Sequence, residues 1–305
     1  MDRPLTLRPA RPEDESGIIA LSAHIWEGDD YIPKVFADWL ADEHGQFTVA
    51  CLNDTIAGCG KLTRLAAGEW WMEGLRVHPE YRGRGIARRL HHNGVALAEQ
   101  LAAEEGSILR FSTHRRNEAV HKLAGESGFH KVSAHMGVEV HAGEANGTVL
   151  PFVPATQETL PALARRLVAS PHFREAGGLF EDSWAWYMLQ PRLAALVREE
   201  RVYFWRPQDR APLDMAGIVI VGDDNRRTLR LNYLDAPDVL KAVVADLHTL
   251  APRYGHHRMR GMPPAAPAFR DAFAAAGWEI APEFEMWIYE RPLGEAQGED
   301  VRAGA

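Results

Sequence analysis

The chain has 305 residues and a formal net charge of −8, with 46% hydrophobic and 25% charged residues. These proportions are typical of globular proteins and exclude a disordered chain, a collagen-like chain and a disulfide scaffold. Neither half has an excess of basic residues, so the electrostatic footprint of a nucleic-acid-binding protein is missing. No apolar run is long enough to cross a bilayer and the N-terminal residues lack a signal-peptide core, which predicts a soluble, cytoplasmic protein.

The first 140 residues alternate between the strand and helix periods of hydrophobicity. Pro12 followed by Glu13 and Asp14 is typical of a helix start, because negative charge there favours the helix dipole. In chain order, the pattern predicts strands at 5–8, 46–52, 55–65, 69–78, 107–113 and 131–141, and helices at 12–26, 32–42, 84–105 and 117–127. Cys51 and Cys59 lie at offset positions of a predicted hairpin, so we expect reduced, buried thiols.

Residues 142–147 are small and polar and form the best linker candidate in the chain. The remainder of the chain repeats the pattern of the first half, with weak similarity between the two copies. Residues 214–217 resemble 55–58, and residues 269–278 resemble the helix that ends at Gly128. We therefore predict a first domain at 1–142, a linker at 143–149, a second and degenerate copy at 150–293, and a disordered tail at 294–305.

The main chemical signal lies where the strand at 69–78 ends and a long helix begins. Gly83 and Gly85 occupy this turn, and glycine lets the backbone turn tightly and bring its N–H groups against an anion. The unpaired N–H groups of the helix start then form a ready pyrophosphate site. A Walker loop is excluded because Arg88 and Arg89 stand where Lys and Ser or Thr are needed. A dinucleotide fingerprint is excluded because the preceding strands have the pattern of an antiparallel meander.

This turn resembles the Arg/Gln-x-x-Gly-x-Gly/Ala motif of the GNAT superfamily of N-acetyltransferases, with Arg82, Gly85 and Ala87 at its fixed positions. The resemblance covers residues 5–140, because the order of the predicted elements is also that of the family, including the last helix that Asn117 opens. It implies an α/β (α+β) fold of two tandem GNAT-like domains. Each would be a mixed, mostly antiparallel sheet flanked by helices, with the second domain degenerate.

The resemblance further implies that acetyl-CoA is the co-substrate. Its pantetheine arm would hydrogen-bond the backbone of Leu75 and Val77, and its pyrophosphate would rest on the amides of Arg82 through Ala87. The residues implied in cofactor binding are Leu75, Arg76, Val77, Arg82, Gly83, Arg84, Gly85, Ile86, Ala87 and Asn117. The acetyl group would pass directly to an amine in a ternary complex, with a backbone N–H near Leu75 stabilising the oxyanion.

Glu73 is the candidate general base. On an extended strand it would share a face with Leu75 and Val77 and so point towards the acyl end of the cofactor. The alternative is a strand glutamate held in a salt bridge. In many family members a tyrosine seven residues after the helix-opening Asn protonates the leaving thiolate, but this position is Ala124 here. His121 or solvent is left for that step.

The connection between the first two predicted helices is the candidate acceptor site, since the resemblance places one wall of that site there. The candidate substrate-binding residues are Glu27, Asp29, Asp30 and Tyr31. Acidic side chains beside a tyrosine suit a ligand that carries a free ammonium group. This stretch and residues 73–77 are similar to the branch that contains histidine N-acetyltransferase. A solvated acidic loop with Tyr31 packed below it is the alternative.

The second copy differs at the phosphate loop, where no glycine is present. Asp235 and Asp238 stand there and would repel a pyrophosphate, so we expect only the first copy to bind the cofactor. No metal site is predicted, because the histidine pairs at 91–92 and 256–257 are adjacent residues that cannot share a helix face.

The sequence therefore predicts an enzyme that moves the acetyl group of acetyl-CoA to a primary amine of a small molecule, such as an amino acid. One alternative is acetylation of a protein N-terminus or lysine. Another is a non-catalytic acyl-CoA sensor, which the missing tyrosine and the degenerate second copy favour. The expected partner is the small-molecule amine, with neither nucleic acid nor membrane, and the expected state is a monomer or a homodimer.

Overall fold

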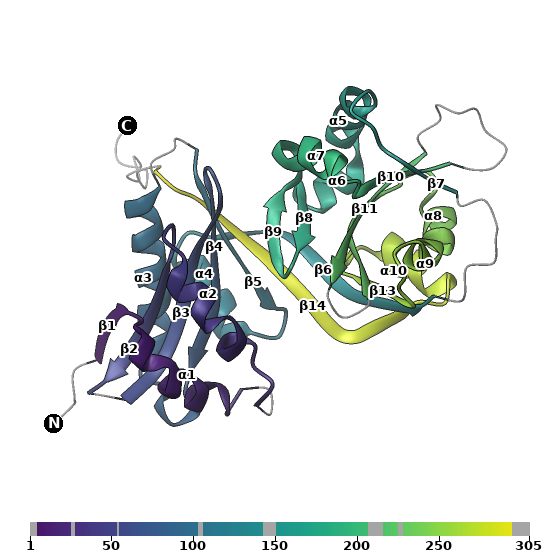
Figure 1. Cartoon of the computed structure of the whole chain (residues 1–305). Helices are drawn as coiled ribbons and strands as arrows, with labels where there is room; N and C mark the ends of the chain where they lie inside the picture. Colours follow the sequence, from purple (N-terminus) through teal and green to yellow (C-terminus); the bar gives the residue numbers. More distant parts are fainter. Residues whose placement is uncertain are drawn as a thin grey trace, which may run out of the picture. The chain divides into compact units, whose positions relative to one another are not determined.

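The computed structural model describes residues 5–25, 28–53, 55–102, 106–142, 151–206, 216–224 and 228–294. The predicted linker and almost all of the predicted tail lie outside these residues. By its internal contacts the chain divides into two compact units (Figure 1). The first unit comprises Met1–Phe111, Ala119–His130 and Tyr289–Ala305, and the second comprises Ser112–Glu118 and Lys131–Ile288.

The first unit is an antiparallel meander extended by one parallel strand. Its strands are β1 (Leu5–Pro9), β2 (Gln46–Leu52), β3 (Thr55–Ala66), β4 (Glu69–Val77) and the first residues of β5 (Ile108–His114). Its helices are η1 (Pro12–Asp14), α1 (Glu15–Ser22), α2 (Ile32–Ala41), η3 (Pro79–Tyr81), α3 (Ile86–Leu101) and most of α4 (Glu118–Glu126). Val49 and Cys51 pack with α1 and α2, whereas Ala50 packs with α3, so these helices cover opposite faces of the sheet.

The strand that closes the first unit comes from the far end of the chain. The sequence predicts residues 131–141 as the last strand of the first copy, and a strand does form there as β6 (His130–His141), but Lys131 onwards belongs to the second unit. The first unit instead takes the end of β14 (Glu279–Pro292), the yellow strand of Figure 1, from Tyr289 on. The contacts thus assign β6 and the end of β14 differently from the predicted bounds of 1–142 and 150–293, because an alternating pattern shows that a segment is a strand but not which sheet it joins.

Side chains at the end of β14 anchor it in the first unit. The Arg110 guanidinium is 1% exposed and binds the Glu69 carboxylate at 2.9 Å and the Glu290 carboxylate at 2.6 Å. The Tyr289 ring stacks on Phe111 with 5.3 Å between ring centroids. A buried guanidinium needs such partners, because an uncompensated charge in the interior is strongly unfavourable.

Replacing Glu290 with glutamine should lower the free energy of unfolding by about 1–2 kcal/mol, because Arg110 would lose one of its two charged acceptors. Urea unfolding of both proteins measures the difference. Glu279→Gln is the matched control, since Glu279 is an exposed residue at the start of the same strand and its change should cost less than about 0.5 kcal/mol. Equal effects of the two changes would contradict the anchoring role of Glu290.

The second unit repeats the meander and its single parallel pair. Its further strands are β7 (Phe152–Pro154), β10 (Val202–Trp205), β11 (Gly217–Asp224), β12 (Thr228–Asp235) and β13 (Arg258–Gly261), with a separate hairpin of β8 (Leu179–Asp182) and β9 (Ala185–Met188). Only β12 and β13 pair in parallel among these strands. Its helices are α5 (Leu160–Ala169), α6 (Pro171–Glu175), α7 (Leu189–Arg198), α8 (Leu240–Asp246), η4 (Leu247–Thr249), α9 (Leu250–Arg253) and α10 (Pro267–Ala275).

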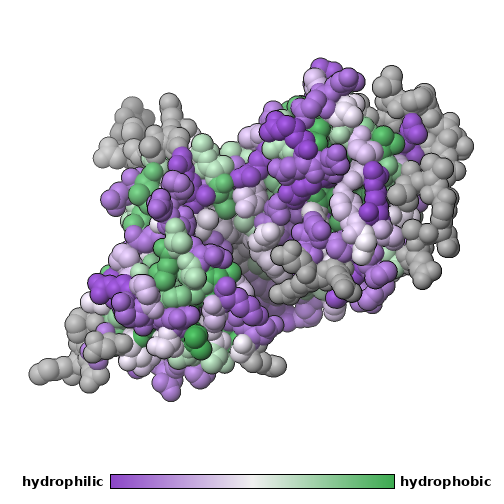
Figure 2. All heavy atoms as spheres, viewed as in Figure 1, coloured by the Kyte–Doolittle hydropathy of each residue, from purple (hydrophilic) through white to green (hydrophobic). Residues whose placement is uncertain are grey.

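Within the described ranges, no helix has both the length and the apolar composition that a bilayer crossing requires. Hydrophilic residues are spread over the face that Figure 2 shows, with small apolar groups between them. Cys51 and Cys59 are both buried and are not joined in a disulfide.

Candidate active site

A bulge in β4 determines how the site is built. Between the pairs Cys59–Arg76 and Lys61–Glu73, one residue of β3 faces two residues of β4. Gly74 lies in the bulge with φ of 64°, a left-handed conformation that favours glycine. A Cβ at this position would lie 2.4 Å from the Trp39 ring of α2, so the close approach of the helix also requires glycine.

The bulge reverses the predicted orientation of Glu73. We expected Glu73 to share one face with Leu75 and Val77, but these two residues pack with α3. Glu73 instead lies opposite Lys61, on the face that Arg76 shares with α2. This part of the prediction is wrong, because it assumed unbroken alternation along the strand, and the extra residue at Gly74 shifts the pattern by one.

The Glu73 carboxylate is partly buried and has a close partner on β3. Its Oε1 accepts a hydrogen bond from Thr63 Oγ1 at 2.6 Å. Burial raises the pKa of Glu73, while the Thr63 hydrogen bond and the Lys61 charge act in the opposite direction. A carboxylate with a raised pKa is a better proton acceptor near neutral pH than an exposed one. Thr63 was not identified from the sequence, because its contact depends on the register of β3 and β4.

The predicted acceptor loop is attached to β4 by an ion pair. The Asp30 carboxylate is fully buried and accepts two hydrogen bonds from Arg76, each at 3.1 Å. The Arg76 guanidinium also lies 5.6 Å from the centre of the Tyr31 ring, and burial raises the pKa of Tyr31. Asp30 therefore holds the loop in place. Because its carboxylate is buried and paired with Arg76, it is not available to bind an ammonium ligand. The sequence did not indicate this pair, because 46 residues separate its members.

The other two acidic candidates of that loop behave differently. Asp29 is exposed and forms a surface ion pair with Lys34 at 3.3 Å. Glu27 lies outside the described residues. Of the acidic candidates in the described part of this loop, only Asp29 is exposed to a ligand, whereas Asp30 is paired with Arg76.

The turn between β4 and α3 has the geometry of an anion cradle. Gly83 and Gly85 have φ of 76° and 74°, and both are exposed. A Cβ at either glycine would meet nothing within 4 Å, so the space beside each glycine is open. Gly85 is the N-cap of a 16-residue helix whose first N–H groups have no intrahelical acceptor. The Arg82 amide differs from the prediction, because it donates to the Pro79 carbonyl at 3.3 Å.

As far as the described residues show, the β4 edge next to this turn is only partly paired. Parallel pairing with β5 covers Glu69–Trp71, and β4 then runs on to Val77 with β3 as its partner. The Leu75 carbonyl accepts a hydrogen bond from Arg76 Nη1 at 3.2 Å. The edge from the bulge to Val77 is therefore the part of β4 available for an extended ligand to bind as an added strand.

Next to the helix expected to carry the proton donor lies Tyr289, which the sequence did not indicate. Ala124 is fully buried, and His121 Nδ1 lies 3.0 Å from the Tyr289 hydroxyl of β14. No sequence signal points to this pair, since 168 residues separate its members. Asn117 is exposed, and its side chain donates to Thr113 Oγ1 at 3.1 Å.

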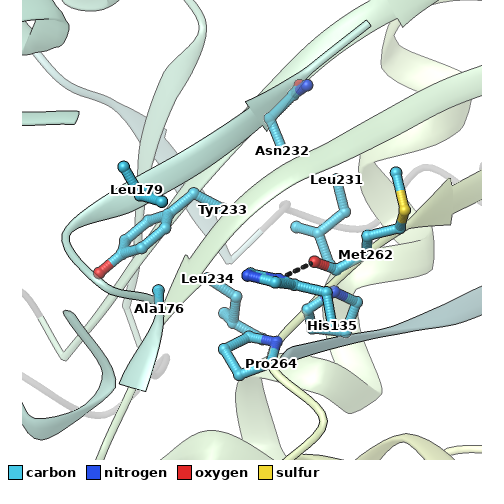
Figure 3. A pocket seen from close by; sticks show the side chains of 10 residues that line it. His135, Ala176, Leu179, Leu231, Asn232, Tyr233, Leu234, Met262 and Pro264 are labelled. Carbon is cyan, nitrogen blue, oxygen red and sulfur yellow. Dashed lines mark hydrogen bonds between the residues drawn. The ribbon is translucent and has the colours of Figure 1, made fainter. Parts of the chain in front are cut away.

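The second unit has no comparable cradle at its own strand-to-helix turn within the residues that the structure describes. Asp235 is fully buried and accepts a hydrogen bond from Ser170, so it does not face the turn as the predicted repulsion of a pyrophosphate requires. Where β12 and β13 separate, the His135 ring is hydrogen-bonded to Ser133 and to the Met262 carbonyl, and a space of only about 10 Å³ remains (Figure 3). Pro264 also lines this space and forms a β-bridge with His135. Side chains therefore fill the position that an extended ligand would need.

The described residues contain no group of three or more His, Cys, Asp or Glu side chains that could hold a metal ion.

Comparisons with known proteins agree with this geometry. The model of the Acetyltransferase (GNAT) family matches residues 16–129. The N-alpha-acetyltransferase RimI of Mycobacterium tuberculosis is 30% identical over 133 residues, which are 42% of this chain and 80% of that protein. The chain belongs to the GNAT acetyltransferase family.

Two further relatives match in part. The human "Probable N-acetyltransferase 16" is 26% identical over 68% of this chain, and the match spans 60% of that protein. The histidine N-acetyltransferase of Oreochromis niloticus is 34% identical over 26% of this chain and 23% of its own length. The predicted likeness to the branch containing histidine N-acetyltransferase is thus confirmed at the level of sequence.

Solved structures share the fold over nearly the whole chain. A GCN5-related N-acetyltransferase from Sphaerobacter thermophilus aligns with a TM-score of 0.60 and 15% identity, covering 96% of each chain. A tandem GNAT protein from the clavulanic acid biosynthesis pathway aligns with a TM-score of 0.55 and 14% identity, covering 96% of this chain and all of that one. The predicted fold class and tandem arrangement are confirmed.

Proposed function

We propose that the first unit is an N-acetyltransferase that transfers the acetyl group of acetyl-CoA to a primary amine of a small molecule, such as an amino acid. The observation that carries this proposal is the exposed pair of left-handed glycines between the bulged strand β4 and the start of α3. The N–H groups from Gly83 to Ala87 hold the pyrophosphate, and the β4 edge up to Val77 holds the pantetheine arm. The bound thioester supplies the activated acetyl group.

The residues of this chain then bring two substrates together and move one proton. Glu73 accepts the proton of the attacking amine on the face that also carries Arg76 and Tyr31. The backbone N–H beside the bulge, near Leu75, stabilises the negative charge that develops on the acetyl oxygen. His121, in contact with Tyr289, is the protein group proposed to return a proton to the leaving thiolate, with solvent as the alternative.

A titration of the protein with CoA should give one site per chain. The first unit has the open glycine turn, whereas in the second unit side chains leave only about 10 Å³ beyond the paired residues of β12 and β13. Isothermal titration calorimetry measures the stoichiometry directly. Two equivalent sites would contradict the structural role that we assign to the second unit.

Acetylation of a protein N-terminus is the second candidate function, and the similarity to an N-alpha-acetyltransferase over 80% of its length favours it. Release of the CoA thiol, followed with a thiol reagent, distinguishes the candidates. We expect turnover with free amino acids, including histidine, to exceed turnover with short peptides of varied N-terminus. The reverse order would establish the second candidate. CoA binding without turnover on either panel would overturn both and leave an acyl-CoA sensor.

A further inference from the structure

The second unit contains a pocket of about 340 Å³ that the proposed reaction does not use. The pocket lies against the sheet strands β6, β12 and β13, the first part of β14 and the β8–β9 hairpin. Its volume is at the lower end of the range for small-molecule sites. The polar side chains that line it are Glu139, Arg230, Arg260 and Glu279, and the large apolar ones are Trp184, Met262, Ile280, Pro282 and Phe284.

Two arginines in this pocket have hydrogen-bond donors without acceptors. Arg230 is 6% exposed, and its Nη2 binds the Glu181 carboxylate at 2.6 Å. Arg260 Nη2 binds the Asp224 carboxylate at 2.5 Å. The Nε of each arginine is buried and has no hydrogen-bond partner among the described residues. Each Nε has almost no accessible surface, so a ligand in the pocket would meet the other N–H groups of the two guanidinium groups, which line it.

The hairpin at the pocket rim presents a large aromatic side chain. Trp184 is 51% exposed and adopts φ of 70°, next to Ser183 with φ of 54°. Two-residue turns of this type favour Asn and Gly, so the indole is kept here at a conformational cost. The Trp184 backbone N–H donates to Glu181 Oε1 at 2.7 Å, the atom that also binds Arg230. One carboxylate therefore fixes both the turn and the arginine.

We propose that this pocket binds a small molecule with one carboxylate and an aromatic or branched apolar group. The carboxylate accepts from the guanidinium N–H groups of Arg230 and Arg260 that line the pocket, and the apolar group packs against Trp184, whose ring centre lies 6.1 Å from that of Phe284. A dianion such as a phosphate monoester is disfavoured, because Glu139 and other carboxylates already surround the two guanidinium groups. An amino acid and its desamino analogue share this chemistry.

Calorimetry with phenylacetate, L-phenylalanine, phenylacetamide and phenethylamine tests the proposal on the full-length chain. At least one of the two carboxylates should bind at one site per chain and about tenfold or more tighter than the amide and the amine. Tighter binding of L-phenylalanine would assign the site to amino acids, and tighter binding of phenylacetate to desamino acids. Equal affinity for acid and amide, or no binding of any of the four, would overturn the proposal.

Two variants locate the binding site. Arg260→Gln removes one donor from a partly exposed side chain, and Trp184→Asn removes the indole while suiting the left-handed backbone. Each should weaken carboxylate binding about tenfold or more while circular dichroism shows that the fold is retained.

Arg174→Gln, at an exposed position of α6 that does not line the pocket, is the matched control and should bind as the wild type. Wild-type affinity in both pocket variants would contradict the assignment. Because Trp184 and Arg260 belong to the second unit, their effect distinguishes this pocket from binding of L-phenylalanine at the proposed acceptor site of the first unit.

Discussion

Replacement of Glu73 by glutamine should lower the turnover number about 10²–10⁴-fold, the usual range for the loss of a general base. The reason is geometric: the carboxylate lies beside the β4 bulge, on the face of Arg76 and Tyr31, with Thr63 as its hydrogen-bond donor. CoA affinity should not change, because the side chain points away from the α3 face of the strand. Steady-state kinetics and a CoA titration of the variant separate the two quantities.

The pH profile gives the sharper measurement. Burial raises the pKa of Glu73, so the base is protonated at low pH and the wild-type rate should rise as pH passes through that raised pKa. In Glu73→Gln this limb should disappear. The deficit of the variant should then shrink as pH increases, because more of the amine is already neutral in solution.

A matched control for this change is Glu43→Gln, which makes the same chemical replacement on an exposed residue after α2. It should leave the rate and the pH profile unchanged. A rate deficit in Glu73→Gln that is equal at every pH would show that Glu73 shapes the strand and accepts no proton. Wild-type rates across the range would transfer the role to Asp29, to Glu27 or to solvent.

The change Gly85→Glu should weaken CoA binding about 100-fold or more, equivalent to roughly 2.7 kcal/mol. Gly85 has an exposed, left-handed backbone at the start of α3, and a glutamate there would place bulk and negative charge where the pyrophosphate binds. The fold should persist, since a Cβ at this position meets nothing within 4 Å. Calorimetry measures the affinity and circular dichroism the fold.

Gly106→Glu is the matched control for this variant. Gly106 has the same φ of 74° and is exposed, and a Cβ added to it would also meet nothing within 4 Å. Both variants therefore carry the same backbone strain, about 1–2 kcal/mol for a non-glycine residue in this conformation. Wild-type CoA affinity in Gly85→Glu, or an equal loss in Gly106→Glu, would contradict the assignment of the turn.

The turn before α3 could be predicted from the sequence because its signals are local. Gly83 and Gly85 occupy the predicted positions, and the amphipathic pattern that follows forms α3 within two residues of its predicted start. The β4 bulge could not be predicted, because nothing in the alternation of residues 69–77 shows where an extra residue enters the ladder. Gly74 is required in this bulge by a tertiary contact, because the Trp39 ring of α2 leaves no room for a Cβ.

Long-range partners account for the remaining differences. From its sequence neighbours, Asp30 is a candidate ligand-binding acid. Its ion pair with Arg76 is seen only in the folded structure. Tyr289 contacts His121 from β14, and the alternating pattern of that strand does not show which sheet it joins. Local patterns therefore predicted most of the elements and the glycine turn before α3, whereas the surroundings of the candidate acid and base depend on pairings between distant segments.

The exchange of the closing strand has a consequence for biosynthesis. The first unit includes Tyr289 and Glu290 of β14. Arg110 therefore lacks one of its carboxylate partners until a residue 180 positions further along the chain has been synthesised. Domains of a chain commonly fold in the order in which the ribosome releases them, and distant contacts slow folding through their loop-closure entropy. Here the N-terminal sheet cannot be completed until the ribosome has released the end of β14. The proposed catalytic unit is therefore completed only after the second unit has been synthesised, although most of its own residues precede it.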